Sequence, residues 1–165
     1  MLKTIEDSFE YGGRTIEIEY RDDDSFEDIP SNETHQVYGL CFLDGKVAIV
    51  EYEKDKPNLP GGKIDAGESW QDGFRREIDE ELSMEVIDMS PIGYQFATNI
   101  EENKKYQLRV VATIRPKTEQ TPDPAGTVTG FKFIEPNEVN KLIDYGPVGE
   151  RMVERALEKL PTLKS

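Results

Sequence analysis

The chain has 165 residues and carries 34 acidic against 20 basic side chains, which gives a formal net charge of −14 at pH 7. This charge argues against a nucleic-acid polymer as partner, because a phosphate backbone is bound chiefly by Lys and Arg. No stretch reaches the roughly 20 apolar residues of a membrane span, and the amino-terminal residues lack the apolar run of a secretory signal. One cysteine, Cys41, excludes an internal disulfide framework. We therefore expect a single cytoplasmic domain over residues 1–165, without a membrane partner.

Residues 1–35 are predicted to form a β-hairpin followed by an acidic loop. Strands are expected over residues 4–10 and 14–20, on either side of a Tyr-Gly-Gly turn, because apolar and polar residues alternate in the second segment. The acidic stretch that follows, residues 21–33, is expected to form a loop on the surface.

Residues 36–160 are predicted to form an α/β core with a mixed sheet. Asp44-Gly45 is a two-residue hairpin signal between expected strands at 36–43 and 46–53. Further elements are expected as strands at 94–98, 106–114 and 127–134, a short helix at 135–143, and a last helix from Pro147 to Leu160. The residues that this last helix would bury are Val148, Met152, Leu160 and either Ala156 or Leu157.

A helix predicted from Ser69 to about Leu82 carries the most informative side chains. Ser69 can cap its amino end, and its apolar stripe consists of Trp70, Phe74, Ile78 and Leu82. Glu77, Glu80 and Glu81 then lie on one flank of that stripe, since residues three and four apart are neighbours on a helix. Two like charges about 5 Å apart repel by roughly 3 kcal/mol at an effective dielectric constant near 20, so a positive partner is expected.

Two kinds of positive group can meet this expectation. Arg76 neutralises part of the charge, and a divalent cation would neutralise the rest. Carboxylate oxygens suit Mg²⁺ or Mn²⁺ better than zinc, which would want His or Cys. The pair Gly61-Gly62, just before the helix, permits unusual backbone angles and the close approach of a metal or phosphate.

The same segment matches a known motif. The pattern G-x5-E-x7-R-E-U-x-E-E, where U is aliphatic, is matched by Gly62, Glu68, Arg76, Glu77, Ile78, Glu80 and Glu81. This segment, from Gly62 to Met84, resembles the Nudix box. It departs from the family pattern at Ser83, where a glycine usually ends the helix. Pro57-Asn58 also stands where many family members carry a bulky aromatic residue.

The resemblance implies a Nudix-type α/β/α sandwich that hydrolyses a nucleoside diphosphate linked to another moiety, with a metal-activated water attacking phosphorus of the diphosphate bridge. It also implies that Mg²⁺ or Mn²⁺ is held by Glu77, Glu80, Glu81 and the carbonyl of Gly61, and that Glu68 orients Arg76 instead of binding metal. The general base stays open: Glu77 is the candidate inside the box, and the candidates outside it are Glu101, Glu102, Glu119 and Asp123.

Substrate contacts are predicted on both sides of the box. The positions expected to contact a small nucleotide-type substrate are Gly61, Gly62 and Arg109. Relatives often stack a base on the strands that here carry Tyr94, Phe96 and Tyr106, although alternating strand residues more often belong to a core.

Two further alternatives stay open. The amino-terminal hairpin is an addition to the minimal Nudix domain, and in some nucleotide-sugar members such an extension builds a dimer, so the chain is expected as a monomer or a homodimer. The alternative to an enzyme is a non-catalytic Nudix-fold module that binds a nucleotide without cleaving it. Retention of the four box glutamates and Arg76 favours the enzyme, because a binding module need not keep a costly carboxylate cluster.

Overall fold

The computed structural model describes residues 1–100, 105–117 and 128–165. The strands are β1 (Thr4–Tyr11), β2 (Arg14–Asp22), β3 (Thr34–Leu43), β4 (Lys46–Tyr52), β5 (Gly61–Lys63), β6 (Met84–Ala97), β7 (Tyr106–Pro116) and β8 (Val128–Ile134). The helices are α1 (Trp70–Leu82), α2 (Val139–Ile143) and α3 (Gly146–Lys159), with short 3-10 helices at Ser31–Glu33, Pro136–Glu138 and Leu160–Thr162. In these three ranges, no helix combines the length and apolar character needed to cross a membrane.

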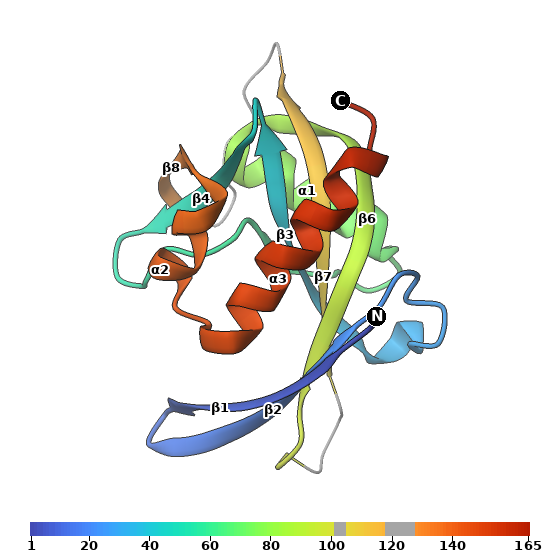
Figure 1. Ribbon diagram of the computed structural model, residues 1–165, viewed down its shortest axis with the longest axis vertical. Helices are drawn as coiled ribbons and strands as arrows, with labels where there is room; N and C mark the ends of the chain where they lie inside the picture. The colour runs from blue at the N-terminus through green and yellow to red at the C-terminus, as the bar shows by residue number, and fades with distance from the viewer. Residues whose placement is uncertain (101–104, 118–127) are drawn as a thin grey trace.

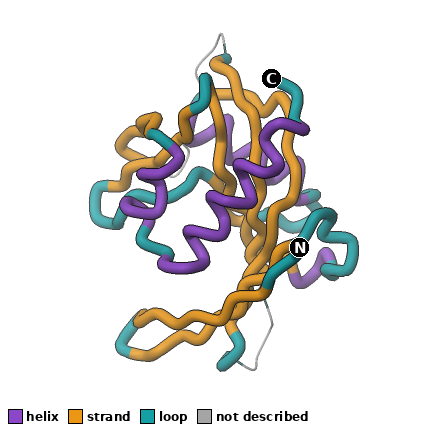
Figure 2. The backbone as a smooth tube through the Cα atoms, viewed as in Figure 1, coloured by secondary structure: helices purple, strands orange, loops and turns teal. Residues whose placement is uncertain are grey.

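The strands form one eight-stranded sheet in the order β1-β2-β6-β7-β3-β4-β8, with β5 paired to β3. β3 and β7 run parallel, whereas the other paired strands run antiparallel. Figure 1 shows α1 behind the sheet and α3 in front of it, and Figure 2 shows the β1–β2 end of the sheet extending away from this body. The predicted mixed sheet between helical layers is therefore confirmed, and the fold is an α/β/α sandwich.

Two apolar clusters, one on each face of the sheet, hold the layers together. The cluster on the α1 face contains Phe74, Ile78 and Leu82 of the predicted stripe, with Trp70 packed at its edge. The cluster on the α3 face contains Val148, Met152 and Ala156. Of the two alternatives for the last helix, Ala156 is therefore the buried residue, and Leu157 is 44% exposed.

The amino-terminal hairpin continues the sheet at one edge and then extends beyond the body of the domain (Figure 1, blue). Its base is fixed by Asp22, whose fully buried carboxylate lies 2.5 Å from the Arg151 guanidinium of α3. The expectation that residues 21–33 form a surface loop was wrong in part. Asp22 belongs to β2 and is buried because α3 neutralises it, and Phe26 is buried because its ring packs against Trp70, with centroids 5.2 Å apart.

Two strands near the box differ from the sequence prediction. β6 begins at Met84, directly after α1, and not at Tyr94. Its register with β7 shifts between Val86 and Asp88 and again between Pro91 and Gly93, which breaks the alternation that marks a strand in sequence.

The short strand β5 was not predicted as a strand from the sequence. β3 pairs with β4 only near its end, at Phe42 and Leu43. Near its start, over Gln36 to Tyr38, β3 pairs with β5. β3 and β4 therefore separate, and the Gly61-Gly62 pair enters the opening between them. This arrangement places Gly62, the start of the box, beside Val37 of β3, and Gly61 beside Tyr38.

Candidate active site

Helix α1 is fixed at both ends, so the direction of its polar flank is determined. Ser69 accepts a hydrogen bond from the backbone N–H of Asp72 at 3.1 Å, as the predicted amino cap requires. At the other end Ser83 takes the left-handed conformation, with φ of 54°, and donates its N–H to the carbonyl of Asp79. The serine thus performs the role expected of the missing glycine, and the helix buries its apolar stripe while its glutamates face the opening beside β5.

Arg76 is the centre of this polar flank. Its guanidinium binds Glu68 through two hydrogen bonds, Nε to Oε2 at 2.9 Å and Nη2 to Oε1 at 3.0 Å. The same group reaches Glu77 at 3.1 Å and Glu80 at 3.3 Å, and it donates to the carbonyl of Lys63 at 2.9 Å. Asp65 also lies 3.4 Å from Nε, so one guanidinium contacts four carboxylates and the negative charge around it remains in excess.

Glu77 lies against the backbone of Gly62. A methyl group at Gly62 would lie 2.6 Å from the nearer Glu77 oxygen, so only glycine leaves room for this carboxylate. The Glu77 side chain is 15% exposed, and burial raises its pKa more than the neighbouring Arg76 lowers it.

Glu81 faces the other glycine of the pair. The backbone N–H of Gly61 donates to Glu81 Oε1 at 2.8 Å, and the Tyr52 hydroxyl donates to Oε2 at 3.3 Å. Gly61 has φ of 144°, and a Cβ there would lie 2.2 Å from the carbonyl oxygen of Val37. Burial first, and then the charge of Glu81, raise the pKa of Tyr52, so this hydroxyl stays a proton donor. Tyr52 was not predicted, because nothing in the pattern of its strand distinguishes it from a packing residue.

The donor set at this flank suits a hard divalent cation in chemistry. Glu77, Glu80 and Glu81 offer oxygen only, and Arg76 leaves part of their charge unneutralised. Within the described part of the chain, no three His, Cys, Asp or Glu side chains already converge as a metal-binding group. Arg76 holds Glu77 and Glu80 while Glu81 binds Gly61, so a cation would have to exchange places with these contacts.

The predicted substrate residues divide into two places. Gly61 and Gly62 lie at the carboxylates. Arg109 lies on β7, on the α3 face of the sheet, where it lines a cavity of about 610 Å³ between the sheet, the hairpin and the start of α3. The four alternative base candidates, Glu101, Glu102, Glu119 and Asp123, lie outside the described residues.

The strand aromatics do not reach that cavity. Tyr94, Phe96 and Tyr106 pack on one another, with ring centroids between 5.4 and 6.2 Å apart, and Tyr94 packs against the cluster on the α1 face. Of the three, Tyr94 packs against an apolar cluster, as the core alternative expects, and the base-stacking alternative stays a prediction. The aromatic side chains that line the cavity include Tyr38 and Tyr145.

The sheet order, the helical layers and the glutamate–arginine flank beside a Gly-Gly strand define a Nudix-type α/β/α domain. A family model for the NUDIX domain matches residues 33–156, which is most of the chain. The chain therefore belongs to the NUDIX family, as the box pattern predicted.

Three individual proteins to which this chain is similar share less than a third of their aligned residues with it. The Bacillus subtilis (strain 168) protein YtkD, named as a candidate 8-oxo-dGTP diphosphatase, is 29% identical over 84 residues, and this match spans half of either chain, 51% here and 50% there. A mutant of the Bacillus subtilis pyrophosphohydrolase BsRppH superposes with a TM-score of 0.69 at 19% identity, covering 92% of this chain and 96% of that one. A structure described as an ADP compounds hydrolase superposes with a TM-score of 0.57 at 17% identity, covering 98% and 92%. At these identities the two structures establish the fold alone.

Proposed function

We propose that this chain is a divalent-metal-dependent hydrolase that cleaves the diphosphate bridge of a small nucleotide. The observation that carries this proposal is the contact of Arg76 with Glu68, Glu77 and Glu80 beside the Gly61-Gly62 strand. Membership of the NUDIX family supports it. The phosphate groups of the substrate would lie at the opening between β3 and β4, beside the backbone of Gly61 and Gly62, which carry no side chains.

Each residue of the site has a task in this proposal. Glu77, Glu80 and Glu81 would hold Mg²⁺ or Mn²⁺, which supplies Lewis acidity toward phosphate oxygens and acidifies the attacking water. Glu68 fixes the guanidinium of Arg76 by two hydrogen bonds, and Arg76 limits the repulsion among the carboxylates. Glu77 is the base candidate inside the box.

The reaction needs no covalent intermediate. The water oxygen bonds to phosphorus, the bridging P–O bond breaks, and the water proton passes to the base. The products are a nucleoside monophosphate, or a related phosphate, and the phosphorylated remainder of the substrate.

A non-catalytic nucleotide-binding module is the second candidate. It is favoured by one observation: Arg76 already occupies Glu77 and Glu80, and no three acidic side chains of the described ranges are placed together to hold a metal ion. In such a module the arginine would replace the metal permanently, and the carboxylates would serve only the local structure.

Metal-dependent product release separates the two candidates. The panel contains nucleoside triphosphates, 8-oxo-dGTP, ADP-ribose, nucleotide sugars and dinucleoside polyphosphates, each with Mg²⁺ or Mn²⁺ and with chelator. The 8-oxo and ADP compounds enter because similar proteins are named for them. We expect cleavage of one class only with metal, and a fall of at least about a hundredfold in Glu80→Gln and in Glu81→Gln, since metal charge stabilisation contributes several kcal/mol.

Asp79→Asn is the matched control on the same helix. Asp79 forms an ion pair with Lys117 at 2.7 Å, so the loss of its charge should leave turnover within about twofold. Unchanged turnover in both glutamine variants would disprove the metal assignment. If no compound of the panel is cleaved and nucleotide binding is retained, the result would favour the non-catalytic nucleotide-binding module.

A further inference from the structure

Arg109 is a buried cation with neutral partners only. Its side chain is 3% exposed, and it donates to the carbonyl of Leu108 at 3.1 Å and to Gln107 Oε1 at 3.3 Å. Its Nε has no hydrogen-bond partner, and among the described residues no carboxylate forms an ion pair with it. Burial lowers the pKa of this guanidinium, but an arginine stays protonated in proteins.

Such an arrangement is costly for folding. A buried charge without an ionic partner destabilises the folded chain by several kcal/mol, and an unpaired buried N–H adds to this cost. The neutral contacts to Leu108 and Gln107 can also be exchanged for another acceptor without breaking an ion pair. A residue of this kind at the wall of a cavity indicates a ligand that supplies acceptors.

The cavity lies close to the carboxylate flank. Tyr38 and Arg109 are neighbours in the parallel pairing of β3 and β7, and the guanidinium lies over the Tyr38 ring at 5.4 Å. On its other side Tyr38 pairs with Gly61 and is close enough to Glu81 and Glu77 for their charges to raise its pKa. A substrate with its diphosphate at Gly61 therefore reaches Arg109 with the part that lies beyond the phosphates.

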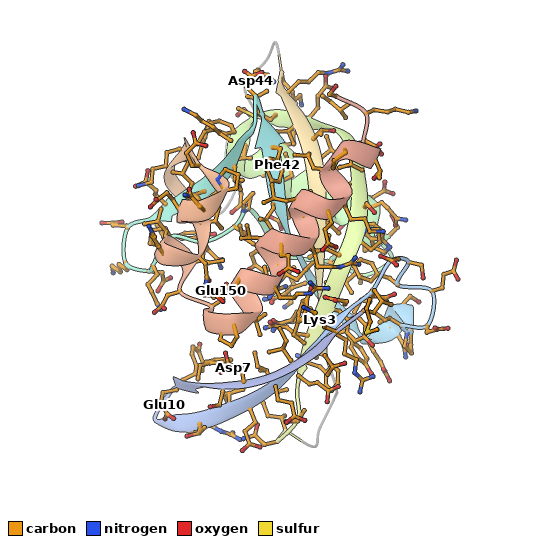
Figure 3. The ribbon with its side chains drawn as sticks, in the orientation of Figure 1. Lys3, Asp7, Glu10, Phe42, Asp44 and Glu150 are labelled. Carbon is orange, nitrogen blue, oxygen red and sulfur yellow. The ribbon has the colours of Figure 1, made fainter. Side chains whose placement is uncertain are left out.

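The charges around the cavity argue against a further phosphate there. Two cations, Arg109 and Lys56, face three carboxylates: Asp7 and Glu10 of the hairpin and Asp144 at the end of α2. Lys56 lies 3.5 Å from Asp144 and is thus partly neutralised. Figure 3 shows Asp7 and Glu10 on the hairpin, across from the first turn of α3. These carboxylates would repel a further phosphate in the cavity, whereas they would not repel a neutral ring.

Flat polar groups surround the remaining space. Gln36, Gln107 and Gln95 follow one another across β3, β7 and β6, and Gln95 donates to Gln107 at 2.8 Å. At the other side Tyr145 donates its hydroxyl to Asn58 Oδ1 at 2.7 Å. Amides and tyrosines of this kind recognise and stack planar rings with hydrogen-bonding edges.

We infer that this cavity binds the base of the substrate and that Arg109 selects guanine. Guanine presents two adjacent acceptors, O6 and N7, which fit an arginine fork, and it carries N1–H and N2–H donors for the carboxylates of the opposite wall. Adenine places a donor beside N7, and a pyrimidine offers a single acceptor in that position. 8-Oxoguanine has a hydrogen on N7 and would meet the fork with a donor. This inference rests on the proposed function, because the diphosphate site fixes which part of the substrate reaches the cavity.

Binding without metal tests the base selection apart from hydrolysis. Calorimetric titration of the wild-type protein in chelator compares GMP, AMP, 7-deaza-GMP and 8-oxo-GMP. We expect GMP to bind at least about fivefold more tightly than AMP, because one good bidentate contact discriminates by 1 kcal/mol or more. 7-Deaza-GMP lacks the N7 acceptor, and it should bind as weakly as AMP, as should 8-oxo-GMP.

A pair of variants assigns the effect to one residue. Arg109→Met and Lys56→Met each remove one cation from the cavity wall. Arg109→Met should abolish the preference for GMP, whereas Lys56→Met should weaken GMP and AMP alike and keep their ratio. Arg109 has no ionic partner among the described residues, so the methionine variant should melt no lower than the wild type.

Several outcomes would overturn the inference. They are equal binding of GMP and AMP, unchanged binding of 7-deaza-GMP, absence of GMP binding, or inorganic phosphate binding that depends on Arg109. The 7-deaza comparison uses the unmodified protein, so the test holds even if Arg109→Met fails to fold. Failure of hydrolysis with the base preference intact would refute the proposed function alone.

Discussion

The absence of a side chain at Gly62 allows the carboxylate of Glu77, a catalytic candidate, to lie against the backbone. A methyl group there would lie 2.6 Å from Glu77, at the flexible end of a side chain, so Gly62→Ala should move the carboxylate and leave the fold intact. We expect turnover to fall about a hundredfold, since a displacement near 1 Å of a catalytic group has effects of this size. Steady-state kinetics beside a thermal melt will measure this.

Gly130→Ala is the control for that change, because a methyl group at Gly130 meets nothing within 4 Å. It should keep full turnover. If Gly62→Ala were equally active, Glu77 would not need the position that the structure gives it.

Ser83 holds a conformation that favours glycine. Its φ of 54° ends α1 in the left-handed region, which costs an L-residue about 1 kcal/mol. Ser83→Gly should therefore raise the melting temperature by about 2–4 °C for a chain of this size. Ser83→Ala, measured beside it by calorimetry, should bring no gain, and an equal gain in both variants would contradict the conformational explanation.

The sequence predicts residues of the site well where spacing on one helix determines geometry. Glu68, Arg76, Glu77 and Glu80 are within contact distance because helical periodicity and one motif place them there. Tyr52 was missed because its contact with Glu81 joins two elements 29 residues apart, and no local pattern contains it.

Among the elements, the hairpin depends on one buried ion pair. Asp22 accepts three hydrogen bonds from Arg151, and Arg155 lies 3.7 Å away. Asp22→Asn removes a negative charge that neutralises the two buried guanidinium groups of Arg151 and Arg155, so it should lower the free energy of unfolding by about 3 kcal/mol. Urea unfolding will measure this against Glu27→Gln, which changes an exposed charge of the same segment and should have little effect. Equal stability of the two variants would show that the pair contributes nothing net.

Elements were predicted where periodicity is regular and missed where it is not. β2 follows simple alternation and α1 a capped apolar stripe, and the Asp44-Gly45 turn signal marks β3 and β4. Bulges hide the first part of β6, and β5 consists of two glycines and a lysine, which carry no strand signal. β5 becomes a strand only because β3 and β4 separate, and that separation is a tertiary event.

For the whole molecule, the cavity is the feature that local patterns could not reveal. Its wall combines the hairpin, three strands of the sheet, the segment before β5 and the start of α3. Arg109 could be named as a strand residue from the sequence. Its lack of a carboxylate partner became visible only when the surrounding elements were placed.

The net charge of the chain leads to a last prediction about stability in salt. Any cation screens the charge of the whole chain, whereas only a cation that binds the α1 carboxylates adds a specific stabilisation. With a net charge of −14, any salt should stabilise the fold by screening repulsion. Mg²⁺ at matched ionic strength should add a specific part, about 2.7 kcal/mol when the ion is a hundredfold above its dissociation constant. For a chain of this size that corresponds to a rise in melting temperature of about 5–10 °C beyond NaCl. Glu80→Gln should lose the specific part and keep the screening part, whereas Asp79→Asn should keep both. Equal effects of MgCl₂ and NaCl on the wild type would mean that the carboxylates of α1 do not bind the metal.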